Sequence, residues 1–207
     1  MEIGATKAVQ DRLKTTKIEE SKGASLVFCW DTYLTKIKGR NVLFIVNASN
    51  RYIIAMTDIE LRNWNYYAMY ISRVLHSVMQ EMGYSEEQIG LYFKMSGDTT
   101  VTKTHGRKSV GGINRMVMDA QYFGKKLEKE ANYQWELSEY LNRDICQPEG
   151  FDAYGYPNEL FKLDMERLGI ISKRKHAKII DFTKYIDDTN RSTNHYHKRI
   201  VKTIVWA

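Results

Sequence analysis

A basic turn between a strand-like segment and a helix-like segment holds the residues best suited to chemistry. The turn lies within residues 99–109 and contains Lys103, His105 and Arg107. Histidine has the ordinary pKa nearest neutrality, which makes His105 a candidate general acid or base. Lys103 and Arg107 supply positive charge beside it, which suits an anion such as phosphate. Lys103, His105 and Arg107 are therefore the predicted catalytic residues.

The same turn also suits the binding of an anion without catalysis. Ser109 is placed to cap a helix, whose free N–H groups and positive dipole end would face a phosphate, and Lys108 adds charge beside them. An ordinary capped turn with solvated charges would have the same composition. The residues themselves leave catalysis, phosphate binding and a purely structural turn open.

A second polar turn, residues 47–51, follows the most apolar strand-like run of the chain, residues 42–46. Polar residues at the end of a rigid buried strand are often part of a binding site. Asparagine and serine are also the usual formers of turns. We include Asn47, Asn50 and Arg51 in the predicted nucleic-acid-binding set on the condition that this turn meets the first one in space.

The positive charge of the chain is concentrated in its last 36 residues. Residues 172–207 contain nine of the 31 basic and three of the 25 acidic side chains, so the preceding 171 residues carry 22 of each. A localised positive field attracts polyanions such as RNA, although a charged surface also simply keeps a protein soluble. The predicted phosphate contacts in this segment are Lys173, Arg174, Lys175, Lys198 and Arg199.

The hydrophobic pattern predicts an α+β fold in which an antiparallel sheet packs against helices. Short turns join three strand-like segments within residues 26–57, which is typical of a meander, and residues 2–5 and 99–104 are also strand-like. Apolar residues between 71 and 82 follow a helical period, Ser85 begins a capping box, and further helices are expected after Ser109 and around residues 137–145.

Proline and glycine placement predicts the domain boundaries. Both prolines of the chain lie in residues 147–157, which we interpret as a linker. Residues 1–146 then form the mixed domain, and residues 158–207 form a small basic C-terminal module that starts with a short helix. No run of apolar residues is long enough for a membrane span and no signal peptide is visible, so a cytoplasmic protein without membrane contact is expected.

The cysteines and the known nucleotide motifs give no indication of a cofactor. Cys29 and Cys146 are too few for a disulfide framework, and neither has a partner at metal-binding spacing. Gly111 and Gly112 fit neither a phosphate-binding loop nor a dinucleotide fingerprint. The sequence therefore predicts no metal and no cofactor, and it gives no oligomeric state.

Three short motifs resemble those of a bacterial domain family of unknown function that is found on mobile elements. The family patterns are Ser-Trp-His in a strand, Asn-x-Ser-Asn-Arg-Tyr in a turn, and Thr-Lys-Thr-x-x-Arg followed by Asn. The corresponding segments here are residues 28–31, 47–52 and 102–107, with Asn114 downstream. Asp31 stands where the family has histidine, so no role of that histidine can be transferred.

The resemblance implies a folded platform with a variable C-terminal module, an arrangement similar to that of anti-CRISPR proteins directed at Cas9. Some of those proteins trim the guide RNA. It therefore implies guide RNA or the Cas9 ribonucleoprotein as partner, and inhibition of Cas9 through guide RNA binding or cleavage as function. Cleavage would make the protein a metal-independent ribonuclease, in which a histidine activates a 2′-hydroxyl and lysine or arginine stabilises the charged phosphorane. The site would be formed by His105, Lys103, Arg107 and the turn at residues 47–51. The alternatives are a non-catalytic nucleic-acid or protein binding module of a mobile element, and a purely structural interaction protein.

Overall fold

The computed structural model describes residues 1–13 and 18–172 of the 207-residue chain. Met1–Ile171 form one compact unit, and the second unit is Ser172–Ala207. The basic residues predicted to contact phosphates in the C-terminal segment lie outside the described residues. They are Lys173, Arg174, Lys175, Lys198 and Arg199.

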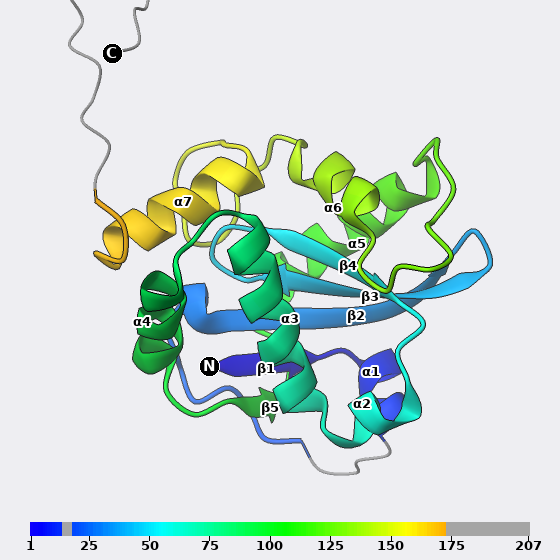
Figure 1. Cartoon of the computed structure of the whole chain (residues 1–207), viewed down its shortest axis with the longest axis horizontal. Helices are drawn as coiled ribbons and strands as arrows, with labels where there is room; N and C mark the ends of the chain where they lie inside the picture. The colour runs from blue at the N-terminus through cyan, green and yellow to red at the C-terminus, as the bar shows by residue number, and fades with distance from the viewer. Residues whose placement is uncertain (14–17, 173–207) are drawn as a thin grey trace, which may run out of the picture. The chain divides into compact units, whose positions relative to one another are not determined.

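Five strands of the described chain form one sheet in the order β4-β3-β2-β1-β5 (Figure 1). The strands are β1 (Glu2–Ala5), β2 (Cys29–Ile37), β3 (Arg40–Asn47), β4 (Ile53–Thr57) and β5 (Thr100–Thr102). The predicted antiparallel meander is present as β2, β3 and β4. β1 instead pairs in parallel with both β2 and β5, so the sheet is mixed. Long connections through helices allow these parallel pairs, which short turns cannot make.

Helices cover both faces of the sheet, which confirms the α+β class. They are α1 (Lys7–Leu13), α2 (Leu61–Asn65), α3 (Tyr67–Glu81), α4 (Glu86–Ser96), α5 (Arg107–Gln121), α6 (Trp135–Asn142) and α7 (Pro157–Arg167). In Figure 1, α3 crosses the near face of the sheet, α5 lies behind it, and α6 lies along the β4 edge, where Ser138 and Asn142 bond to the β4 backbone. None of the described helices is long and apolar enough to cross a bilayer.

The alternation of side chains along β3 shows why its sequence is apolar throughout. Leu43 and Ile45 belong to the core that contains α3, α4 and α7, whereas Phe44 and Val46 belong to the core under α5 and α6. All four side chains are at most 1% exposed. A strand that is covered on both faces needs apolar residues at every position. The sequence prediction of a central strand at residues 42–46 is therefore confirmed.

Helix starts illustrate one correct and one wrong prediction. Ser85 caps α4 in the predicted capping box with Gln88. The prediction that Ser109 caps α5 is wrong, because α5 begins at Arg107 with Gly106 as the cap residue. The Ser109 hydroxyl instead donates a hydrogen bond to the buried Asp31 carboxylate, and such charge-assisted bonds are stronger than neutral ones.

The region after α6 packs into the first compact unit. The predicted linker at residues 147–157 lies inside Met1–Ile171, and its Gly150 N–H donates to the Ser49 carbonyl over 2.9 Å. From α7, Phe161 and Met165 are fully buried in the same core as Trp30. The helix predicted to open the C-terminal module thus contributes to the core of the sheet domain.

Candidate functional site: a buried histidine cluster beside a basic hollow

A buried polar cluster lies on one face of β1 and β2. Four neighbouring positions of these strands, which we call the grid, form its base: Glu2, Gly4, Cys29 and Asp31. Glu2 pairs with Cys29 in the parallel register, and Gly4 pairs with Asp31 further along. Residues two apart on a strand share a face, so all four positions point the same way. A Cβ on Gly4 would lie 1.9 Å from Asp31 Oδ1. The absence of a side chain there lets the segment after β5 cross β1 and place His105 over the grid.

The His105 imidazole lies between two carboxylates. Its Nδ1 is 2.7 Å from Asp31 Oδ1, and its Nε2 is 3.0 Å from Glu2 Oε2. The three side chains are between 0% and 5% exposed. Burial lowers the pKa of His105, but hydrogen bonds with Asp31 and Cys29 outweigh it and raise the pKa to about 10. At neutral pH the ring is therefore an imidazolium that donates to both carboxylates.

Both carboxylates have further donors that fix their position. Asp31 accepts from the His105 backbone N–H over 3.1 Å and from the Ser109 hydroxyl. Glu2 accepts from the Ser21 hydroxyl over 2.6 Å and from the Lys22 N–H over 2.8 Å. Burial raises the pKa of Glu2, but these bonds and His105 lower it by more, so the net pKa is below its ordinary value. The cluster is a satisfied ionic network, as buried charges require.

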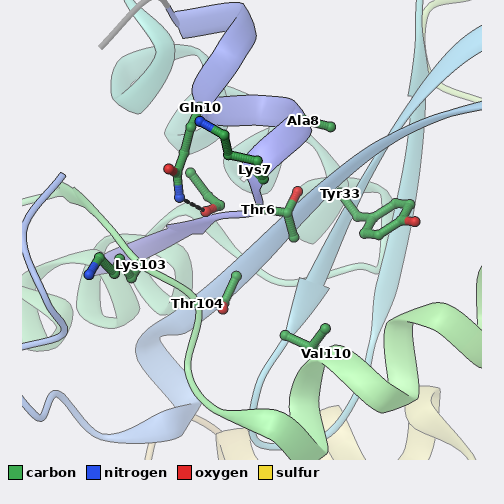
Figure 2. Close-up of a pocket in the computed structure, with 9 residues that line it drawn as sticks. Thr6, Lys7, Ala8, Gln10, Tyr33, Lys103, Thr104 and Val110 are labelled. Carbon is green, nitrogen blue, oxygen red and sulfur yellow. Dashed lines mark hydrogen bonds between the residues drawn. The ribbon is translucent and has the colours of Figure 1, made fainter. Parts of the chain in front are cut away.

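A basic hollow lies at the carboxyl end of β1, where α1 begins (Figure 2). Its volume is about 440 Å³, within the range of roughly 300–1,000 Å³ for small-ligand sites. Thr6 and Thr104 bring hydroxyl groups to its wall, and the Tyr33 ring stands on the side toward α5. Lys7 and Lys103 also line it. The hollow thus combines two hydroxyls, two lysine side chains and an aromatic ring, although the Thr6 hydroxyl donates to the Thr32 carbonyl over 2.9 Å. The Lys103 ammonium group points away from Thr6 and Tyr33 toward its ion pair with Glu20 (Figure 2).

Within residues 1–13 and 18–172, the ion pairs of the two lysines of the hollow are surface pairs. Lys7 Nζ is 2.8 Å from Asp11 Oδ1, with side chains 82% and 62% exposed. Lys103 pairs with Glu20 across side chains that are 54% and 74% exposed. Such pairs contribute about 0–1 kcal/mol in water. Either ammonium group can therefore exchange its carboxylate for a phosphate at little cost.

The predicted catalytic residues lie in one segment but face different surroundings. His105 belongs to the buried cluster, whereas Lys103 lines the hollow. Arg107 and Lys108 form the first turn of α5, and their side chains lie outside the described part of the structure. Because both ring nitrogens of His105 contact carboxylates, the geometry fits a bridging role better than contact with a substrate. The catalytic role of these residues stays a prediction.

The turn at residues 47–51 ties the sheet to two helices. Asn47 Oδ1 accepts from N–H groups of its own turn, and Asn50 Nδ2 donates to Asp164 Oδ2 of α7 over 2.9 Å. Both asparagines are at most 1% exposed. The Arg51 guanidinium packs so close to Gly112 of α5 that a Cβ there would lie 2.6 Å from Nε. Among the described contacts, α5 links this turn to the buried cluster, through Gly112 and Ser109 respectively.

Sequence reasoning missed several members of both sites. Glu2, Cys29 and Ser109 were not assigned to the cluster, and Thr6, Lys7, Tyr33 and Thr104 were not assigned to the hollow. One detectable signal is an acidic residue among the apolar residues of each of two strand-like segments, Glu2 and Asp31, because a buried charge needs a partner. The partner is unpredictable from spacing, since His105 lies 74 residues from Asp31.

The fold and the site define an α+β domain built on a mixed sheet, with a buried ionic cluster under the segment that joins β5 to α5. The chain belongs to the family described as Domain of unknown function (DUF6933), whose model matches residues 2–160. The match contains all five strands and both sites. Comparison with curated proteins and with solved structures gave no match. The family description carries no activity, so the functional argument rests on the sites themselves.

Proposed function

We propose that this protein is a non-catalytic binding module for single-stranded RNA, with the hollow as the place where one nucleotide binds. The observation that carries the proposal is the lining of the hollow, where Lys7 and Lys103 lie with the Thr6 and Thr104 hydroxyls and the Tyr33 ring. Cations and hydroxyls suit a phosphate, and an aromatic ring suits an unstacked base. The small volume favours one nucleotide over a duplex.

Binding without cleavage is favoured by the state of His105. A general base for RNA cleavage needs a free nitrogen near its target, and it needs a pKa near the working pH. In this structure both nitrogens contact carboxylates, and the pKa is raised to about 10. The imidazolium would hold its proton. Lys103 keeps a role in the proposal, as a phosphate contact.

Guide RNA of Cas9 is the particular RNA that we propose as target. This part of the proposal is supported by the sequence resemblance alone, and the basic residues 172–207 are expected to add phosphate contacts of their own. Cas9 would then be inhibited because this protein binds the guide RNA that Cas9 needs. A non-CRISPR RNA of a mobile element is the alternative target.

The test is fluorescence anisotropy of the full-length protein with a short single-stranded RNA and with a guide RNA, at several salt concentrations. Each phosphate contact to a single strand contributes about −0.7 to the slope of log affinity against log salt. Lys7→Gln combined with Lys103→Gln should flatten the slope by about 1.4 units. Lys94→Gln is the matched control, because Lys94 is an exposed lysine on α4, away from the hollow.

Two outcomes would contradict the proposal. An unchanged slope in the double variant would remove the hollow from the RNA surface. Shortened guide RNA on a denaturing gel, produced by the wild type and not by folded His105→Gln, would replace binding by cleavage. Lost Cas9 activity with intact guide RNA is the result that we expect.

A further inference from the structure

Three side chains with different ligand atoms meet in the buried cluster. Ligand atoms of Glu2, Cys29 and His105 all lie within 4.8 Å of one another. They come from neighbouring strands and the segment that crosses above them, so the sheet register and Gly4 hold them in place. The Cys29 side chain already interacts with His105, because it is among the groups that raise the pKa of the imidazole.

We propose that Glu2, Cys29 and His105 bind a zinc ion. A thiolate, an imidazole and a carboxylate are the three ligand types of protein zinc sites. Thiolate selects against magnesium and calcium, which prefer all-oxygen sites. A water molecule would complete the tetrahedron, as at zinc sites with three protein ligands.

The spacing between imidazole and carboxylate is already close to what a zinc ion needs. In a tetrahedral site with bonds of about 2.0–2.1 Å, nitrogen and oxygen ligands lie about 3.3 Å apart. His105 Nε2 and Glu2 Oε2 are 3.0 Å apart. The ion would replace the proton that lies between these two atoms. Nε2 and Oε2 would then have to move apart by about 0.3 Å. Cys29 Sγ lies within 4.8 Å of both other ligand atoms, and rotation of its side chain can bring it to the ion.

Charge balance favours the exchange of protons for zinc. Binding releases the Nε2 proton of His105 and the thiol proton of Cys29, and it adds a dication in their place. The net charge of the buried cluster is therefore the same before and after binding. The thiol proton is weakly bonded, with Sγ 3.5 Å from the Ser25 carbonyl oxygen, so its loss sacrifices little hydrogen bonding.

The groups around the ligands already form the outer shell that zinc sites use. Metal-binding histidines donate their other ring N–H to a carboxylate or a carbonyl, and His105 Nδ1 lies 2.7 Å from Asp31 Oδ1. The Glu2 carboxylate is oriented by Ser21 and Lys22. These two residues are exposed, so the ion can enter from the segment that covers Glu2.

The experiment uses the full-length protein, stripped with a chelator and titrated with Co²⁺ as the spectroscopic substitute for zinc. We expect a thiolate-to-cobalt charge-transfer band in the near ultraviolet that saturates at one ion per chain and disappears when Zn²⁺ is added. Asp31→Asn should keep the band but weaken the affinity about 10- to 100-fold, because the outer-shell carboxylate is lost. Histidines in residues 173–207 cannot produce a thiolate band.

The two cysteines provide a matched control. Cys29→Ser should abolish the band, and Cys146→Ser should leave it unchanged, since Cys146 lies in a separate cluster with Phe151 and Leu160. If Cys29→Ser fails to fold, Glu2→Gln tests the same site by a shift of the band. Absence of the band in the wild type, or its loss in Cys146→Ser alone, would overturn the proposal. Neither result depends on RNA binding.

Discussion

The buried cluster and the basic hollow share one chain segment, yet the charged side chains are buried and fully paired in the cluster and exposed in the hollow. Residues 103 and 104 line the hollow, and residue 105 enters the cluster. In the cluster every ionic side chain is at most 5% exposed and has several partners, whereas the lysines of the hollow are more than half exposed. Buried charges stabilise only as a complete set, while exposed charges remain free for ligands.

Removal of one member of the cluster should have the largest effect on stability. Asp31→Ala leaves the His105 cation and the Ser109 hydroxyl without their buried acceptor. Breaking a buried pair in this way costs about 3–5 kcal/mol. Asp11→Ala, which breaks the exposed pair with Lys7, should cost less than about 1 kcal/mol. Urea unfolding of the two variants measures both losses in the free energy of unfolding. Equal losses would show that the cluster stabilises the fold no more than a surface ion pair does.

The grid under His105 should be the next most sensitive feature. Gly4→Ala places a Cβ 1.9 Å from Asp31 Oδ1 and 3.0 Å from Thr104 Cα, so the Asp31 side chain and the crossing segment must shift. Overpacking of this kind costs about 1–3 kcal/mol. Gly90→Ala is the control, because a Cβ in that exposed helix position meets nothing within 4 Å, and it should stabilise by about 0.4–1 kcal/mol. A stable Gly4→Ala protein would contradict the close crossing of β1.

The cluster should also make stability depend on alkaline pH in protein kept metal-free by a chelator. The pKa of His105 is raised from 6.5 to about 10, so its contribution is complete below pH 6.5 and is lost as pH rises through 10. The free energy of unfolding should fall over this range by at most about 1.4 kcal/mol per pH unit. His105→Gln should remove this dependence, and the Lys7→Gln and Lys103→Gln double variant should keep it. An equal slope in His105→Gln would assign the effect to other groups.

The sequence predicts those features that depend on local pattern. The apolar run at residues 42–46 and the capping box at Ser85 are set by periodicity and by neighbours within four residues, and the structure confirms both. Parallel pairing of β1 is not predictable in this way. It depends on which strand edges remain free after the meander forms, and residues far apart in the sequence decide that.

The candidate site shows the same division. His105 and Lys103 were found because of their types and their place before a helix. Their separation into a cluster and a hollow depends on Gly4, which looks like an ordinary strand residue in the sequence. Ser109 stands in the sequence where a helix cap is expected. In the structure its hydroxyl donates to the Asp31 carboxylate of β2, a contact that the local sequence does not indicate.

The smallest effect on stability, and the clearest on binding, is expected from Lys103. Among the described side chains, its ammonium group pairs with the exposed Glu20, so Lys103→Gln should change the free energy of unfolding by no more than about 0.5 kcal/mol. The same substitution should flatten the salt slope for RNA by about 0.7 units. His105→Gln should do the reverse, with a large loss of stability and an unchanged slope in the fraction that folds. Thermal unfolding and anisotropy on the same two preparations decide the comparison. If Lys103→Gln binds RNA with the wild-type slope while His105→Gln alters it, the cluster and not the hollow lies at the RNA surface, and the functional roles of the two regions must be exchanged.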